Sequence, residues 1–304
     1  MESVLIYKGH RRFSRQKLTG IAMHWSKGLF CLILTLTIIV VGGTKQAFAG
    51  EDPGDLFNYS FAVWLGSGFY KVNDADKKLA VLRVPARYSL RPMQSGESAP
   101  IDRLGFRLLL PAVIAYQEET DTDLDFGAFA FVPGLEIEIP VNKYWTLKPF
   151  GQMGAGKDTA GGTLQYIYGG GIKSLVSVPW RKFLFGIGNS WIVAEDKDSS
   201  SHGTKGFSLF NAGLDIRHPT NLTVFDRQLD ISGYFIVNYF KNAVDILSDD
   251  GDTSKLKTLY EVGLTFGIKE PVDIWLVSFD RVGIDYRWGD EGLRGIGFNL
   301  GFPF

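Results

Sequence analysis

The sequence has almost no cysteine, few histidines and, beyond its first fifty residues, no long apolar run. Its single cysteine is Cys31, and it has four histidines. Disulfide bonds therefore cannot stabilise an exported form of the chain that lacks its N-terminal region, whereas a closed, hydrogen-bonded barrel could do so. After residue 50 no apolar run approaches the roughly 18 residues that a membrane-spanning helix needs.

The N-terminal region has the three parts of a secretory signal peptide. Basic residues up to Lys27 precede an apolar run at residues 28–41, and Ala47-Phe48-Ala49 follows. This order predicts a signal peptide at residues 1–49 that is cleaved after Ala49, with Ala47 and Ala49 forming the Ala-x-Ala site. An uncleaved N-terminal anchor is the alternative. Met23 begins a better-proportioned signal than the first methionine does.

The rest of the chain has no excess of positive charge. Residues 1–49 contain seven of the 32 basic residues and one of the 33 acidic residues, which leaves 25 basic and 32 acidic residues and a net charge of −7. We therefore expect no nucleic acid partner. Aromatic residues make up 14% of the chain and glycines number 36, which suits the aromatic girdles and small interior positions of a membrane barrel.

Apolar residues alternate with small or polar ones throughout residues 58–304. In residues 79–91, for example, Leu82 and Val84 share one parity, while Arg83 and Arg87 share the other. A strand with this pattern has one apolar and one polar face. Such segments occur at residues 59–72, 79–91, 103–117, 126–140, 144–156, 163–176, 180–194, 207–217, 225–240, 256–268, 277–288 and 293–304.

These segments predict an all-β fold, a transmembrane antiparallel up-and-down β-barrel of about 12 strands at residues 58–304, preceded by a short periplasmic leader at 50–57. An even number of strands returns both ends of the barrel to one side. Longer polar loops would then lie on the outer side, and tight turns at 141–143, 177–179 and 218–221 on the inner side. The alternative is a soluble β-sandwich, which rarely needs a dozen strands of this length.

The last predicted strand has the features of a C-terminal assembly signal. Its large apolar residues are spaced two apart, and they are Ile296, Phe298, Leu300, Phe302 and Phe304. We expect this row to face lipid up to Phe304. The pattern resembles the C-terminal signal of bacterial outer-membrane β-barrels. It predicts a location in the bacterial outer membrane, with membrane lipid, lipopolysaccharide and the barrel assembly machinery as partners.

Charged residues gather on the inward parity of the predicted strands. They are Arg83, Arg87, Arg103, Arg107, Glu136, Glu138, Lys148, Glu261, Arg281, Asp285 and Arg287, together with Asp215 and Arg217. Charges that face a lipid-shielded lumen must be paired or hydrated. Paired charges would form a polar core that closes the barrel, and hydrated charges would line a narrow channel and tune its selectivity. The sequence leaves both interpretations open.

The sequence gives little support for an enzyme. Asp215 and His218 are close in sequence, but His218 falls at a predicted inner turn, and His202 is the only other histidine after residue 49. The acidic residues Asp249 and Asp252 lack the spacing of a calcium-binding loop. We therefore expect no catalytic residues, cofactor or metal. An outer-membrane enzyme that acts on lipid or peptide at the extracellular rim, or a translocator for a separate chain, is the alternative function.

Three segments resemble one family: FVPGLEIEIP at residues 131–140, WTLKPF at 145–150 and GAGKD at 154–158. They are similar to the solitary autotransporter-like β-barrel family of Gram-negative outer membranes. The resemblance implies a twelve-stranded barrel like an autotransporter translocator. It does not imply a passenger domain, because only the leader at 50–57 precedes the first predicted strand. We expect a narrow porin-like channel or a structural or surface barrel.

Overall fold

The computed structural model describes the barrel region with several gaps. The described residues are 63–72, 78–94, 103–118, 128–158, 164–198, 204–224, 227–247, 253–274 and 277–304. The predicted signal peptide, its cleavage site at Ala47 and Ala49, the leader, His202 and the acidic residues Asp249 and Asp252 lie outside them. Within the described residues, no helix is both long and apolar enough to cross a membrane.

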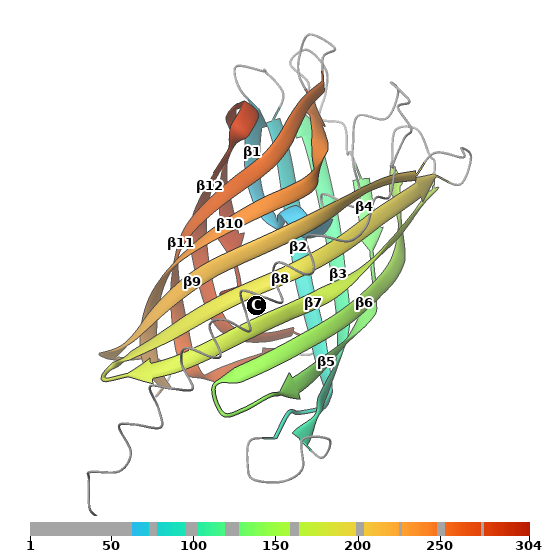
Figure 1. Cartoon of the computed structure of the whole chain (residues 1–304). Helices are drawn as coiled ribbons and strands as arrows, with labels where there is room; N and C mark the ends of the chain where they lie inside the picture. The colour runs from blue at the N-terminus through green and yellow to red at the C-terminus, as the bar shows by residue number, and fades with distance from the viewer. Residues whose placement is uncertain are drawn as a thin grey trace, which may run out of the picture. The chain divides into compact units, whose positions relative to one another are not determined.

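Antiparallel strands form a closed barrel (Figure 1). The strands are β1 (Ser67–Val72), β2 (Lys78–Arg91), β3 (Gly105–Glu118), β4 (Ala128–Phe131), β5 (Gly134–Pro140), β6 (Trp145–Asp158), β7 (Leu164–Trp180), β8 (Phe183–Asp198), β9 (Thr204–Val224), β10 (Arg227–Leu247), β11 (Thr253–Ile274), β12 (Val277–Gly289) and β13 (Leu293–Asn299). β1 pairs with both β2 and β13, which closes the ring. β4 and β5 share one position between β3 and β6, so the thirteen strands fill twelve positions. The predicted fold class is confirmed.

The two ends of the barrel differ in their connections. We call the end that carries the short helix η2 (Asp290–Gly292) the loop end, and the end that carries the β7–β8 turn at Arg181 and Lys182 the turn end. The turns predicted at 177–179 and 218–221 are wrong, because these residues lie within β7 and β9. Pro179 and Pro219 suggested turns there, but each pairs with a residue of the neighbouring strand, so the sheet overrides the local signal.

The two faces of the wall carry different side chains, with the parity that the sequence predicts. On the outer face Leu82, Leu264 and Phe298 are 55%, 43% and 55% exposed. On the inner face Thr265 and Asp285 are buried. Alternate residues of a strand point to opposite faces, so this register places the apolar row outside and the charges inside along each strand.

The chain enters the barrel through its lumen, which corrects the first predicted strand. β1 begins at Ser67, and Val63 to Leu65 form one helical turn with Val63 and Leu65 buried inside, although the sequence analysis placed these residues in the first predicted strand at 59–72. Gly66 has φ +91°, a conformation that other residues rarely adopt, and it turns the chain from the lumen into the wall. The alternation before Gly66 therefore belongs to an interior segment. Phe69 does face outward.

The predicted C-terminal strand is also shorter than expected. β13 ends at Asn299, and Gly301, with φ +108°, turns the chain into the lumen. Ile296 and Phe298 face outward as predicted, but Phe304 is buried inside and the ring of Phe302 lies 6.0 Å from that of Tyr234. The prediction that Phe302 and Phe304 face lipid is wrong. The lumen offers their rings a more complete burial than the end of an edge strand would.

The wall is incomplete toward the turn end. β1 and β13 have six and seven residues, whereas their outer neighbours β2 and β12 have 14 and 13. Beyond Ser67 and Phe298, β2 and β12 contact one another directly, and the described residues show no backbone pairing between these two strands. We call this contact the seam.

Candidate functional site: the barrel lumen

An apolar layer crosses the lumen near the loop end. Its inward side chains are all buried, and they include Val113, Ala115, Val132, Ile167, Ile192, Phe207, Leu209, Phe240 and Leu256. The helical turn before β1 packs into the same layer, with the ring of Trp64 5.7 Å from that of Phe150. Water needs polar partners to occupy a buried space, and this layer offers few. Among the described residues, the layer therefore fills this level of the lumen with apolar side chains.

A buried arginine ties β1, β11 and β12 together beneath this layer. Arg287 Nε lies 2.8 Å from Asp285 Oδ1 and 3.1 Å from Glu261 Oε2. Its Nη1 donates to the Tyr70 hydroxyl at 2.6 Å and to the carbonyl oxygen of Leu65. Two carboxylates and two neutral acceptors thus surround one guanidinium, as a buried charge requires. This part of the lumen is a paired polar core.

The same network continues toward the segment that follows β13. The Tyr234 hydroxyl donates to Glu261 Oε1 at 2.6 Å, and Asn299 Nδ2 donates to Tyr234 Oη at 2.9 Å and to Asp285 Oδ2 at 3.0 Å. The side-chain oxygen of Asn299 accepts from the backbone N–H of Gly301 at 3.2 Å. The network therefore holds the point at which the chain turns into the lumen.

Arg281 anchors a second polar group, which lies nearer the turn end of β10, β11 and β12. Its Nη1 donates to Ser232 Oγ at 2.9 Å and to Thr265 Oγ1 at 2.7 Å, and its Nη2 pairs with Asp230. Thr265 is fully buried, so its hydroxyl depends on these partners.

On the opposite side of the lumen, basic side chains outnumber acidic ones. We name Arg83, Arg87, Arg107, Lys148 and Lys173 the basic cluster, which comes from β2, β3, β6 and β7. Glu138 Oε2 lies 3.1 Å from Arg107 Nε, and Glu136 lies 3.5 Å from Lys173 Nζ and 3.9 Å from Arg107 Nη1. Both glutamates are buried.

Residues 301–304 occupy the lumen near the turn end. The ring of Phe304 lies over Gly188, where any Cβ would overlap with it, and a Cβ at Gly213 would come within 3.1 Å of the Phe302 ring. Lys148 Nζ donates to an oxygen of the terminal carboxylate of Phe304 at 3.1 Å. The inward glycines of β8 and β9 thus form a seat for two aromatic rings, next to the basic cluster.

A cavity of about 270 Å³ lies between these groups. The basic cluster, Glu136, Glu261 and Arg287 line it, together with the residues of the 301–304 segment. The structure therefore brings together most of the charges that the sequence predicted on the inner face. Arg103 precedes β3 rather than belonging to it, and Asp215 pairs with Arg217 at 2.6 Å, on β9.

Sequence reasoning missed several members of this site. Lys173 lies on the inward parity of the predicted strand at 163–176, so the alternation could have identified it. Tyr70, Tyr234 and Asn299 gave no such signal, because a tyrosine or an asparagine suits either face of a barrel strand. Asp215 is buried inside, while His218 contacts Phe183 on the outer face, with ring centroids 4.9 Å apart. These two residues do not form an acid–histidine pair.

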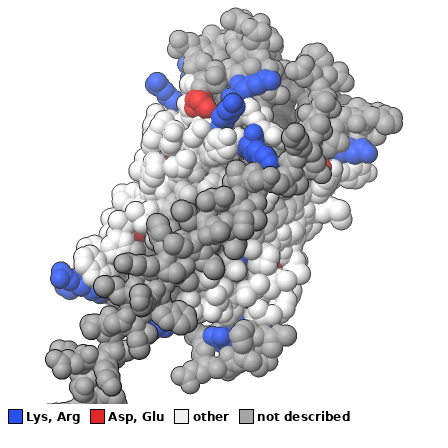
Figure 2. Space-filling model, viewed as in Figure 1, with Lys and Arg blue, Asp and Glu red and all other residues white. Residues whose placement is uncertain are grey.

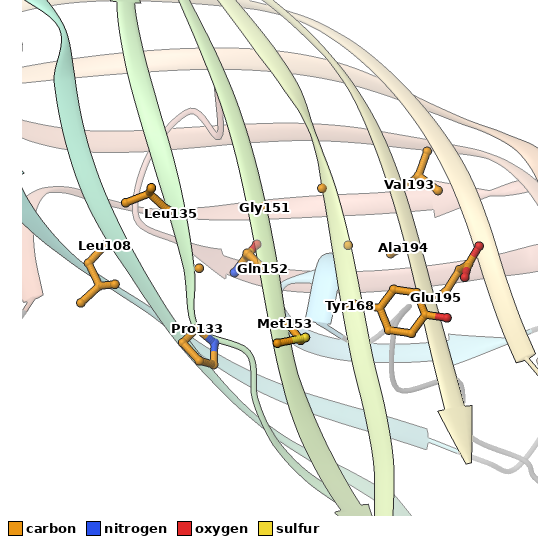
Figure 3. Close-up of a pocket in the computed structure, with 13 residues that line it drawn as sticks. Leu108, Pro133, Leu135, Gly151, Gln152, Met153, Tyr168, Val193, Ala194 and Glu195 are labelled. Carbon is orange, nitrogen blue, oxygen red and sulfur yellow. The ribbon is translucent and has the colours of Figure 1, made fainter. Parts of the chain in front are cut away.

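An outer groove of about 690 Å³ runs across β3, β5, β6, β7 and β8 (Figure 3). Cross-strand pairs along it link Leu108, Leu135, Gly151, Gly170 and Val193. The two adjacent glycines leave the wall bare of side chains, and a Cβ at Gly151 would meet nothing within 4 Å. Such a depression in an apolar face can be filled by lipid chains.

Comparison with known proteins gives structural similarity but no sequence match. No known family model matches the sequence, and no curated protein matches it. Among solved structures, the β domain of the Bordetella autotransporter BrkA is similar to this chain, with a TM-score of 0.39 and 8% sequence identity over 78% of this chain and 96% of that chain. The fold of this chain is established by the strand pairing described above.

Proposed function

We propose that the protein is an integral outer-membrane β-barrel that carries no enzymatic site and whose lumen is closed at rest. The outer face supports the membrane location. On the face shown in Figure 2, uncharged side chains cover the wall, and Lys, Arg, Asp and Glu gather toward its two ends. Exposed apolar side chains such as Met153, Val282 and Ile284 cannot face water over so wide a surface without promoting aggregation. In lipid the same surface is stabilising.

Aromatic side chains on the outer face mark both edges of this apolar band. Near the loop end Tyr260 stacks on Trp288, with ring centroids 5.5 Å apart. At the turn end Trp180 and Phe183 flank the β7–β8 turn and are 56% and 38% exposed. Tyrosine and tryptophan favour the interface between hydrocarbon and water, so two aromatic belts delimit the part of the wall that would lie in the membrane.

The contents of the lumen support the second part of the proposal, that the lumen is closed at rest. Paired charges, the apolar layer and the aromatic residues 302 and 304 fill most of the interior. This arrangement favours the closed polar core over the hydrated channel. The function would then reside in the loops or in ligand binding, as in a structural or surface-interaction barrel.

Single-channel recording of the refolded mature protein in a planar bilayer tests this proposal. A folded barrel migrates differently on electrophoresis before and after heating, so this shift is measured on the same sample. We expect a heat-modifiable barrel that inserts into lipid and gives no steady current. Steady openings whose ion selectivity changes in the Arg83→Ala/Arg87→Ala variant would show instead that these arginines line an open channel.

Two further assays address the other functions. Hydrolysis of lipid or peptide by the folded barrel, absent from a heat-denatured sample, would identify an enzyme at the rim. Stable co-purification of a second chain that spans the lumen would identify a translocator. We expect neither result, because the apolar layer leaves no path for a chain and Asp215 and His218 lie on opposite faces.

A further inference from the structure

Positive charge exceeds negative charge around the lumen cavity. Its lining has six basic side chains, those of the basic cluster and Arg287, and two acidic ones, Glu136 and Glu261. Two further carboxylates, Asp285 and Glu138, pair with Arg287 and Arg107. Six basic groups against these four side-chain carboxylates and the terminal carboxylate of Phe304, which also lines the cavity, leave a formal charge of +1. Charges shielded from water by a lipid-covered wall need neutralisation, so this excess favours a bound anion.

Arg83 lines the cavity and has an unsatisfied side-chain nitrogen. Its Nε is buried, and no described residue accepts a hydrogen bond from it. Its backbone is fixed, because Ser67 Oγ both accepts from the Arg83 N–H and donates to the Arg83 carbonyl oxygen. Arg83 also lies within electrostatic range of Lys173, a like charge. A buried guanidinium that faces another cation is costly unless an anion lies between them.

The neighbouring lysines have unused hydrogen-bonding capacity. Lys148 Nζ donates to an oxygen of the terminal carboxylate of Phe304, and Lys173 Nζ approaches Glu136 Oε2 at 3.5 Å. Each ammonium has three hydrogens to donate, and these contacts use only some of them. The terminal carboxylate of Phe304 shows that an acceptor oxygen fits beside Lys148. Three cationic side chains, those of Arg83, Lys148 and Lys173, therefore line one side of the cavity.

We propose that the lumen binds a small oxyanion, a phosphate or carboxylate group, between Arg83, Lys148 and Lys173. The cavity of about 270 Å³ equals about nine water volumes, enough for such a group and its hydration. Arg87, on the same parity of β2, is exposed and extends the positive charge to the surface. The proposal rests on the proposed function, because it needs a barrel wall that shields the cluster from water.

Thermal unfolding of the refolded barrel in detergent, followed by its heat-modifiable migration, tests the site. The probes are sodium phosphate and sodium acetate, each compared with sodium chloride at equal ionic strength, and a short-chain phosphatidic acid added to the micelles. We expect phosphate or acetate to raise the unfolding midpoint by about 3 °C near saturation, because a ligand that binds only the folded state stabilises it. Arg83→Gln and Lys173→Gln should each abolish this rise, whereas Lys197→Gln, on the outer face of β8, should preserve it.

The different probes distinguish between the possible sources of the anion. A rise with phosphate or acetate identifies a free solute, and a rise with phosphatidic acid alone identifies a lipid headgroup. No rise over chloride with any probe, or an equal rise in the Arg83→Gln and Lys173→Gln variants, would overturn the proposal. A chain that folds without heat-modifiable migration or membrane insertion would instead contradict the proposed function.

Discussion

The ring of Phe304 occupies the space that a side chain at Gly188 would need. Gly188 lies on the inward face of the extended strand β8. A glycine is needed there because a side chain would have no space, not because the backbone conformation requires one. The glycine lies near the middle of the barrel sequence and the ring at its end, and they fit only if residues 301–304 fold into the lumen. This fit makes the position of the segment testable by substitution.

Gly188→Ala should destabilise the folded barrel by about 1–3 kcal/mol, because the added methyl group overlaps with the Phe304 ring. Gly151→Ala, on the open outer face of β6, is the matched control and should change stability little. Urea unfolding of both variants measures the difference. In a chain that lacks residues 302–304, Gly188→Ala should become nearly neutral; a full cost in that background would place the segment elsewhere.

Asp285→Ala should cost about 3–5 kcal/mol, because it leaves the buried Arg287 guanidinium with one carboxylate fewer. Arg294→Gln, which removes an exposed charge from the outer face of β13, should stay within about 0.5 kcal/mol of the parent. Equilibrium unfolding in vesicles compares the two. Equal effects would mean that the Arg287 network does not stabilise the barrel.

Leu264→Arg should destabilise the protein in lipid by about 2–4 kcal/mol, since Leu264 lies midway along the outer face of β11. Leu222→Arg, close to the turn end of β9, should cost about 0–1 kcal/mol, as expected beyond the hydrocarbon. The comparison requires unfolding from vesicles of defined thickness. The reverse order would show that the apolar band is placed wrongly on the wall.

Gly301→Ala should cost about 1–3 kcal/mol, because φ at this residue is +108° and a side chain is strained there. Gly233→Ala is the control, since a Cβ at Gly233 has only a carbonyl oxygen at 4.0 Å and the residue lies in an extended strand. Thermal unfolding reads out both variants. A neutral Gly301→Ala would imply that the chain continues along the wall instead of turning inward.

The outer surface was predictable from the sequence to a greater extent than the lumen was. Outward residues in the middle of the wall are apolar, so a period of two identified them along β2, β3 and β10 without further information. The interior tolerates charges, glycines, aromatics and aliphatic residues alike, and for this reason parity alone did not distinguish the polar core from the apolar layer. Lys173 could have been identified, but Tyr234 and Asn299 could not.

The two ends of the barrel sequence were predicted wrongly for a related reason. Val63 and Leu65, like Phe302 and Phe304, continue the spacing of the adjoining strand, and a row of alternate apolar residues looks the same whether it meets lipid or fills a lumen. The glycines with positive φ at 66 and 301 mark both departures from the wall. No periodicity rule distinguishes such a glycine from the many that simply pack inside a strand.

The seam between β2 and β12 makes the wall mechanically uneven. Elsewhere around the barrel, pulling neighbouring strands apart would break a ladder of backbone hydrogen bonds, whereas along the seam the described residues show no backbone pairing. Thermal fluctuations large enough to part the wall should therefore begin there, next to the bends at Gly66 and Gly301. The seam would therefore be the line along which the wall opens first, and unfolding would start at one side of the barrel instead of all around it.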